Sequence, residues 1–153
     1  GITANMARKP QGGDRDQIKA AAAGECDIAI GNTYYYGQMQ TSKDEAKKTA
    51  ADKVALFWPN QADRGAHVNI SGAAVTKAAK NKANATKLIE FLSNDKAQKC
   101  YASRNVEYPV KAGVGIDGTV AARGTPKFDD IGLDKVADQQ AVAVKSFDRV
   151  GWR

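Results

Sequence analysis

Three consecutive tyrosines, Tyr34, Tyr35 and Tyr36, are the residues whose types and spacing could do chemistry. A tyrosine has an apolar ring and a polar hydroxyl, so packing or general ligand contact is one interpretation of this run. In a strand the three side chains would alternate between faces, whereas in the first turn of a helix Tyr34 and Tyr35 could face one point. Asn32 or Thr33 could cap such a helix. The run therefore predicts either a packed aromatic edge or two convergent hydroxyl groups.

Two convergent phenol groups would favour a hard metal ion. Phenolate is a hard anionic oxygen donor, and such donors suit a highly charged cation better than the thiolate and imidazole sites that softer metals prefer. Fe(III) fits this description best, although a receptor that stacks on or hydrogen-bonds to an anion or a small organic solute is the alternative. A free tyrosine has a pKa of about 10, and a bound cation can remove its proton. Metal binding should then release protons, and acid should weaken it.

The segment before the tyrosines is predicted to be a helix followed by a strand. A glycine turn leads into Asp14, and Gln17 stands three residues later, which together form a capping box. The alanine-rich stretch that follows favours helix and ends at Gly24. Cys26–Ile30 is short and rich in apolar residues, and it predicts a strand that ends just before the tyrosine run.

The same order of elements is repeated after the tyrosines. Ser42 and Glu45 form a second capping box, which predicts a helix to about Lys53, and Val54–Trp58 predicts a second strand. Alternating helices and strands are typical of an α/β fold with mixed or parallel sheets. Ligands bind at the carboxyl ends of the strands in such sheets, which is where the tyrosine run would lie.

Weaker patterns complete the predicted fold. They are a strand over Ala66–Ile70, a helix over Lys82–Leu92, a short helix capped by Asn94, a glycine-rich connector over Val110–Thr125 and a closing amphipathic helix over Leu133–Phe147. We detect no internal repeat.

Composition excludes several classes of protein. The net charge of +6 is spread along 153 residues and interleaved with acids, so we expect no nucleic-acid partner. The apolar runs are far shorter than the roughly 20 residues that a membrane span requires. The sequence has a single His, no Gly-x-Ser-x-Gly and no phosphate loop, which argues against an enzyme. Cys26 and Cys100 lack the spacing of a zinc site, and either a disulfide or two buried thiols is open.

Several stretches of the chain resemble the periplasmic ferric-iron-binding proteins of ABC transporters. The Asn-Thr-Tyr-Tyr run is the specific part of the likeness, whereas the Phe-Leu-Ser pattern is shared by many solute-binding proteins. The resembling stretches are Ala4–Gln17, Gly24–Tyr36, Pro59–Gln61, Arg64–Gly72, Phe91–Gln98, Glu107–Val110 and Phe147–Trp152.

The resemblance implies a two-lobed, hinge-closing receptor that binds Fe(III) through Tyr34 and Tyr35, resides in the periplasm and delivers the metal to a permease. It gives Tyr36 a packing role. Arg8 would neutralise a phenolate or hold a companion anion such as carbonate, because the metal site would carry excess negative charge. His67 would lie near the hinge and be structural.

Family members are about twice this length, so the resemblance covers their C-terminal half. The start, without an initiator Met or a secretion signal, is expected to be processed, engineered or truncated. The remaining metal ligands would come from the missing upstream half, and the receptor would otherwise be a monomer. The expected lobes are 1–61 in the C-terminal lobe, 64–113 crossing into the N-terminal lobe and 114–153 returning. The two cysteines would then lie in different lobes, where a bond would restrict closure.

Overall fold

The computed structural model describes residues 1–9, 11–116 and 118–152. Within these ranges the regular secondary structure is helical apart from one β-bridge. The elements are η1 (Ile2–Asn5), α1 (Asp14–Ala22), α2 (Thr33–Gln40), α3 (Glu45–Asp52), α4 (Lys82–Leu92), α5 (Asp95–Cys100), η2 (Tyr101–Asn105), α6 (Gly118–Ala121), α7 (Leu133–Asp138) and α8 (Gln140–Val150). In the part of the chain so described, each helix is too short or too polar to cross a lipid bilayer.

The chain divides into two compact units, and each contains segments that are distant in the sequence. Unit 1 comprises Gly1–Gln11, Trp58–Val68 and Pro126–Arg153, and unit 2 comprises Gly12–Phe57 and Asn69–Thr125. These units are groups of contacting residues and do not test the predicted lobes 1–61, 64–113 and 114–153, which stay a prediction.

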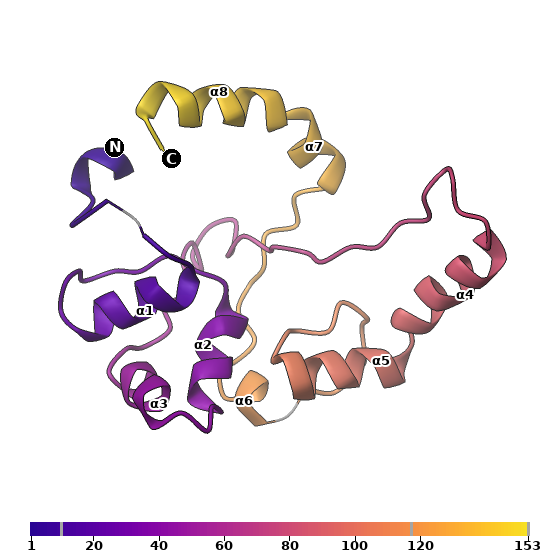
Figure 1. Ribbon diagram of the computed structural model, residues 1–153, viewed down its shortest axis with the longest axis horizontal. Coiled ribbons are helices and arrows are strands. Elements are labelled where there is room, and N and C mark those ends of the chain that lie inside the picture. The colour runs from indigo at the N-terminus through magenta and orange to yellow at the C-terminus, as the bar shows by residue number, and fades with distance from the viewer. Residues whose placement is uncertain (10, 117, 153) are drawn as a thin grey trace. The chain divides into compact units, whose positions relative to one another are not determined.

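Helices α1, α2 and α3 pack together in unit 2 around one small core (Figure 1). Ile18 of α1, Met39 of α2 and Ala51 of α3 are its buried members, and the last two are 0% exposed. Half-buried apolar groups surround them: Tyr35, Tyr36, Ala50 and Val54. Part of the tyrosine run is therefore supported from below by a packed core.

Two predicted helix caps are wrong, although both helices form. The N-cap of α1 is Gly13 rather than Asp14, and the Asp16 carboxylate accepts a hydrogen bond from the Gly13 amide at 2.9 Å. The N-cap of α3 is Asp44 rather than Ser42, and its carboxylate accepts a hydrogen bond from the amide two residues later at 3.0 Å. A carboxylate is favoured at both helix starts because it interacts with the positive end of the helix dipole.

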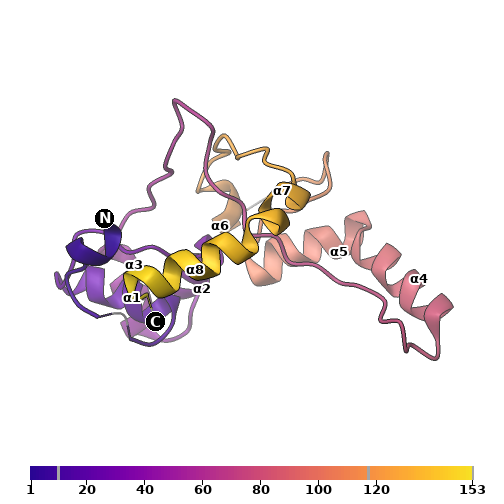
Figure 2. The same ribbon diagram turned by 90° about the horizontal axis from the view of Figure 1, so that it is seen from above.

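The helices α4 and α5 form a continuous arm of unit 2 (Figures 1 and 2), and both follow the prediction. Asn94 caps α5, with its side-chain oxygen accepting a hydrogen bond from the Ala97 amide at 2.9 Å. The buried Gln98 side chain donates to the Leu92 carbonyl and accepts from the Val110 amide, both at 2.9 Å. The first bond joins α5 to the end of α4, and the second attaches the loop after η2 to α5.

Unit 1 contains the β-bridge, which pairs Ala66 with Phe128 in parallel. The Ala66 amide donates to the Lys127 carbonyl and the Asp129 amide donates to the Ala66 carbonyl, both at 2.9 Å. Gly65 stands at this contact with a φ of +99°, and a Cβ there would lie 2.7 Å from the Lys127 carbonyl oxygen. Glycine is therefore required for the close approach of these two backbones.

The predicted closing helix over Leu133–Phe147 is wrong in one respect, because it is divided into α7 and α8. The Gln139 amide bonds to the Val136 carbonyl at 3.2 Å, a three-residue spacing that tightens the turn and interrupts the α-helical register. Figure 2 shows α8 following α7 along the chain. Large apolar side chains remain exposed on both helices, with Leu133 at 61% and Val142 at 58%.

The three predicted strands, Cys26–Ile30, Val54–Trp58 and Ala66–Ile70, do not form ladders in the part of the chain that the structure describes. Apart from the bridge at Ala66, these stretches have no ladder partner within the described residues, and they run without regular structure. A strand satisfies its backbone only by pairing with another strand, so an apolar segment without a partner cannot become one. The α/β assignment is thus supported here in its helices, and the sheets stay a prediction.

Candidate metal centre

The tyrosine run opens helix α2, as one of its two predicted geometries required. Asn32 is the N-cap with extended backbone angles, and the Tyr35 amide bonds to the Asn32 carbonyl at 3.2 Å. The Asn32 side-chain oxygen accepts a hydrogen bond from the Asn69 side-chain amide at 3.1 Å. Asn69 was not singled out in the sequence. The start of α2 is therefore attached to a segment 37 residues further along the chain.

Tyr34 and Tyr35 lie close together in the first turn of α2. Their ring centroids are 4.3 Å apart and their planes are inclined by 43°. Both side chains are half-buried, so their hydroxyl groups combine support from the protein with access to a ligand. Tyr36 differs, because it packs against the core and its hydroxyl donates to the Val54 carbonyl at 3.3 Å. The predicted packing role of Tyr36 is confirmed.

The electrostatic surroundings of Tyr34 keep its phenol protonated. The pKa of Tyr34 is raised from its ordinary value of 10.0 to about 12, first by the hydrogen bond with Tyr35 and then by partial burial. The negative charges of Asp14 and Glu107 raise this pKa further. A ligand that takes the oxygen of Tyr34 as a phenolate must therefore displace a firmly held proton.

The guanidinium of Arg15 contacts the other member of the pair. Its Cζ atom lies 4.6 Å from the centroid of the Tyr35 ring, and one of its amino groups donates to the Gln38 side-chain oxygen. The sequence analysis missed both residues. A signal was present for Arg15, because a cation in the first turn of a helix opposes the helix dipole and suggests a tertiary reason for its position.

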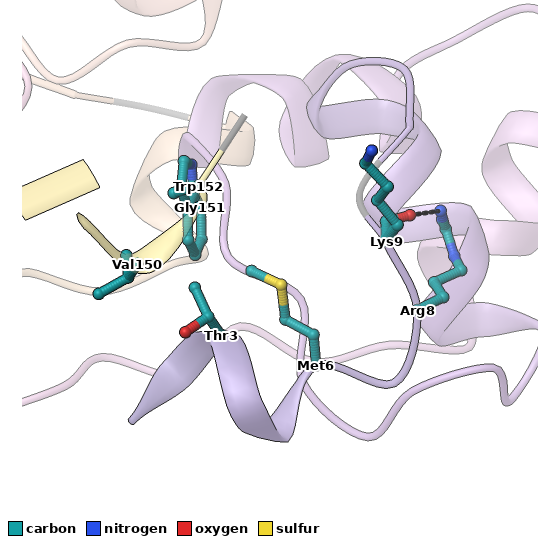
Figure 3. Close-up of a pocket in the computed structure, with 7 residues that line it drawn as sticks. All are labelled: Thr3, Met6, Arg8, Lys9, Val150, Gly151 and Trp152. Carbon is teal, nitrogen blue, oxygen red and sulfur yellow. Dashed lines mark hydrogen bonds between the residues drawn. The ribbon is translucent and has the colours of Figure 1, made fainter. Parts of the chain in front are cut away.

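Arg8 and His67 belong to unit 1, whereas the tyrosine pair belongs to unit 2. Arg8 lines a pocket of about 370 Å³ in unit 1 and its guanidinium donates to the Lys9 carbonyl at 3.4 Å (Figure 3). The other lining residues include Thr3, Met6, Val150 and Trp152. His67 is exposed directly after the β-bridge. A role for Arg8 toward the ligand of the tyrosine pair stays a prediction.

Cys26 and Cys100 both lie in unit 2 and carry free thiols. Cys26 is half-buried and Cys100, at the end of α5, is exposed, so the interpretation as two buried thiols is wrong. Within the described ranges no three His, Cys, Asp or Glu side chains gather closely enough to hold a metal ion. That finding does not concern phenol oxygens.

The family described as bacterial extracellular solute-binding protein matches residues 4–138 of this chain. The chain belongs to this family of solute-binding proteins. Over 153 residues it is 46% identical to iron uptake protein A1 of Synechocystis, a match that covers 100% of this chain and 42% of that protein. The predicted family is therefore confirmed.

Solved structures give the same result. A Trichodesmium protein in complex with iron and citrate ligands is 45% identical with a TM-score of 0.91, and the match covers 97% of this chain and 47% of that chain. The ferric binding protein from Campylobacter jejuni is 41% identical with a TM-score of 0.93, over 97% of this chain and 47% of that chain. The chain thus has the fold of about half of such a protein.

Proposed function

We propose that this chain is the C-terminal half of the substrate-binding component of a ferric iron ABC transporter. Tyr34 and Tyr35 hold Fe(III) as phenolates in the cleft between the lobes of the complete receptor, which resides in the periplasm and delivers the metal to a permease. The observation that carries the proposal is the pair of adjacent phenol rings, 4.3 Å apart, at the start of α2. The names of the relatives, iron uptake and ferric binding proteins, support the choice of metal.

The charge state of Tyr34 supports a strongly charged cation. Because the pKa of Tyr34 is raised to about 12, this phenol is neutral near pH 7 and an ion must displace its proton to bind as proposed. A hard trivalent ion does this more readily than a soft divalent one, because the attraction for the phenolate oxygen grows with the charge of the ion. Binding therefore releases protons, and acid weakens it.

We further propose that an upstream half of the same receptor completes both the metal site and the fold. Two phenolates do not fill the coordination sphere of Fe(III). The extended segments on either side of α2 and α3 also expose large apolar groups, with Ile28 at 81%, Ile30 at 73% and Phe57 at 83% exposed. Strands from the upstream half would pair with these segments and cover those side chains. The matched relatives are long enough to supply such strands, since this chain spans less than half of each.

A companion anion would complete the charge balance of the site. Citrate accompanies iron in the Trichodesmium structure, and carbonate is the anion that the family resemblance implies. We propose Arg8 as the cation that holds such an anion or neutralises a phenolate, because a guanidinium binds carboxylate oxygens in a bidentate manner. Closure of the two lobes would then stabilise the loaded state, since both lobes would contribute ligands.

The test is a visible absorption titration with Fe(III) nitrilotriacetate, run on this chain alone and on the chain joined to its upstream half. A tyrosinate-to-iron charge-transfer band is expected in the joined protein. Tyr34→Phe and Tyr35→Phe should each weaken Fe(III) binding by more than about a hundredfold. Tyr36→Phe is the matched control and should leave the band in place, because its hydroxyl already bonds to the Val54 carbonyl.

Two outcomes would contradict the proposal. One is the absence of the band in the joined protein, and the other is a band that survives both substitutions in the pair. A colourless complex of the joined protein with citrate alone would instead support a receptor of the same fold for an anion or a small organic solute.

A further inference from the structure

The position of Arg15 in α1 is unfavourable for the helix that contains it. Arg15 is the second residue of α1, where the free amide groups make the helix end positive and disfavour a cation. Acidic residues occupy the positions on both sides, Asp14 and Asp16, as the helix dipole prefers. A positive charge between them needs a tertiary explanation.

That explanation lies on α2, where Arg15 makes two contacts one helical turn apart. The guanidinium stacks 4.6 Å from the centroid of the Tyr35 ring and donates to the side-chain oxygen of Gln38. Because residues three apart lie on the same face of a helix, one planar group can contact both. Arg15 thus limits the rotation of the Tyr35 ring, which also packs against the core of Ile18, Met39 and Ala51.

The guanidinium of Arg15 contacts the Tyr35 ring and the Gln38 side chain rather than a carboxylate. Arg15 forms no ion pair in the part of the chain that the structure describes. The Asp16 carboxylate accepts from the Gly13 amide and lies 3.9 Å from the ammonium group of Lys19. Arg15 is therefore the cation that lies over the ring of Tyr35.

We propose that Arg15 is the positioning residue of the metal site, fixing the ring of Tyr35 and compensating the negative charge of its metal-bound oxygen. This inference rests on the proposed function. When Fe(III) binds, the O–H bond of Tyr35 breaks, its proton passes to solvent water, an oxygen–iron bond forms and no electron is transferred. The guanidinium interacts only weakly with a neutral ring but strongly with a phenolate, so its contribution is largest in the loaded state.

The test uses three variants in the chain joined to its upstream half. Arg15→Gln removes the charge and keeps hydrogen-bonding groups, whereas Arg15→Lys keeps the charge and loses the planar fork. Lys19→Gln is the matched control, because it removes one charge from the exposed side of the same helix. The probe is Fe(III) nitrilotriacetate, and the readouts are the affinity for Fe(III) and the wavelength of the charge-transfer band.

Arg15→Gln should weaken Fe(III) binding by about tenfold and move the band to longer wavelength. The band should move to longer wavelength because the energy of a phenolate orbital rises when no cation is nearby. The energy gap to the empty orbitals of the iron then becomes smaller. Arg15→Lys should restore the wavelength more fully than the affinity, and Lys19→Gln should change neither. If Arg15 acted only through packing, Arg15→Lys would not restore the wavelength of the band.

A second readout needs no iron and uses the 153-residue chain itself. The near-ultraviolet circular dichroism of the two closely spaced rings should decrease in Arg15→Gln and stay unchanged in Lys19→Gln. If the wild-type joined protein shows the band and Arg15→Gln has the same band wavelength and the same affinity for Fe(III), the proposed role of Arg15 is contradicted. If the joined wild-type protein shows no band, the proposed function fails instead. A thermal unfolding transition in each variant shows that the variant is folded, so that neither result can be ascribed to a failure to fold.

Discussion

Unit 2 contains helices and extended segments that bury their apolar side chains very differently. The helices are α1 to α3, and the extended segments follow α1 and α3. Met39 in α2 is 0% exposed, whereas Ile28 and Phe57 in the extended segments are 81% and 83% exposed. A helix satisfies its backbone within itself, so helices can pack as soon as their apolar faces meet. A strand satisfies its backbone hydrogen bonds by pairing with another strand, so the extended segments need a partner from another part of the protein.

This contrast indicates which part of the proposed metal site is organised by this chain alone. The start of α2 packs on the core that Ile18, Met39 and Ala51 form. Arg15 of α1 contacts the start of α2. The tyrosine pair is therefore in place before any partner arrives. In the proposed receptor, the upstream half adds further ligands and covers the exposed apolar groups.

Met39→Ala should give the largest loss of stability, because it opens a cavity in the fully buried centre of the helical group. We expect a decrease in the free energy of unfolding of about 2–5 kcal/mol, measured by urea denaturation of the chain. Val142→Ala in α8 removes a side chain that is 58% exposed and should change this free energy by less than about 0.5 kcal/mol. Equal decreases in the free energy of unfolding of the two variants would contradict the contrast between the packed helices and the exposed apolar positions.

Gly37→Ala should have the next largest effect. A Cβ on Gly37 would lie 1.7 Å from an amino nitrogen of Arg123 and 3.3 Å from a methyl group of Thr119. Arg123 is held there, since its other amino group donates to the Val106 carbonyl at 3.0 Å. The expected loss is about 1–3 kcal/mol in the same denaturation experiment.

Gly72→Ala is the matched control for Gly37, because a Cβ there meets nothing within 4 Å. Its free energy of unfolding should change by less than about 0.5 kcal/mol. A tolerated Gly37→Ala would show that α2 is not closely packed against α6 and its flanking residues.

Val54→Ala and Phe57→Ala compare two positions in one extended segment. Val54 packs against the helical core, and its truncation should cost about 1 kcal/mol in the chain alone. Phe57→Ala should leave the stability of the chain alone unchanged, but should destabilise the protein that contains the upstream half. A Phe57 variant that is equally neutral in both proteins would contradict the proposed covering of this segment.

The smallest expected effect concerns the titration of Tyr34. Because its pKa is raised to about 12, its contribution to stability is present below the ordinary pKa of 10.0 and is lost as the pH rises toward 12. Tyrosinate ultraviolet absorbance in Tyr35→Phe should show a lower pKa for Tyr34, since the hydrogen bond with Tyr35 is the largest cause of the shift. Tyr36→Phe should leave it unchanged. A pKa near 10 in the wild-type chain would contradict the described hydrogen bond.

Helices could be predicted from this sequence because their signals are local. The bounds of α4 and the Asn94 cap of α5 followed directly from periodicity and cap residues. The caps of α1 and α3 were misplaced by one or two residues, since several acceptors stand close together there and geometry selects among them. The adjacency of Tyr34 and Tyr35 could be predicted because the two residues are neighbours in the sequence, and their role as ligands stays a prediction.

The sequence by itself determined the helical segments, the tyrosine run and the likeness to ferric-iron-binding proteins, because each depends on residues that are neighbours along the chain. Only the tertiary structure decided that Arg15 lies over Tyr35 and that Asn69 bonds to Asn32, 37 residues apart. It also decided that Cys26–Ile30 and Val54–Trp58 form no ladder within the described residues. Such contacts form between segments distant in sequence, and their free energy depends on which partners the folded chain brings within reach.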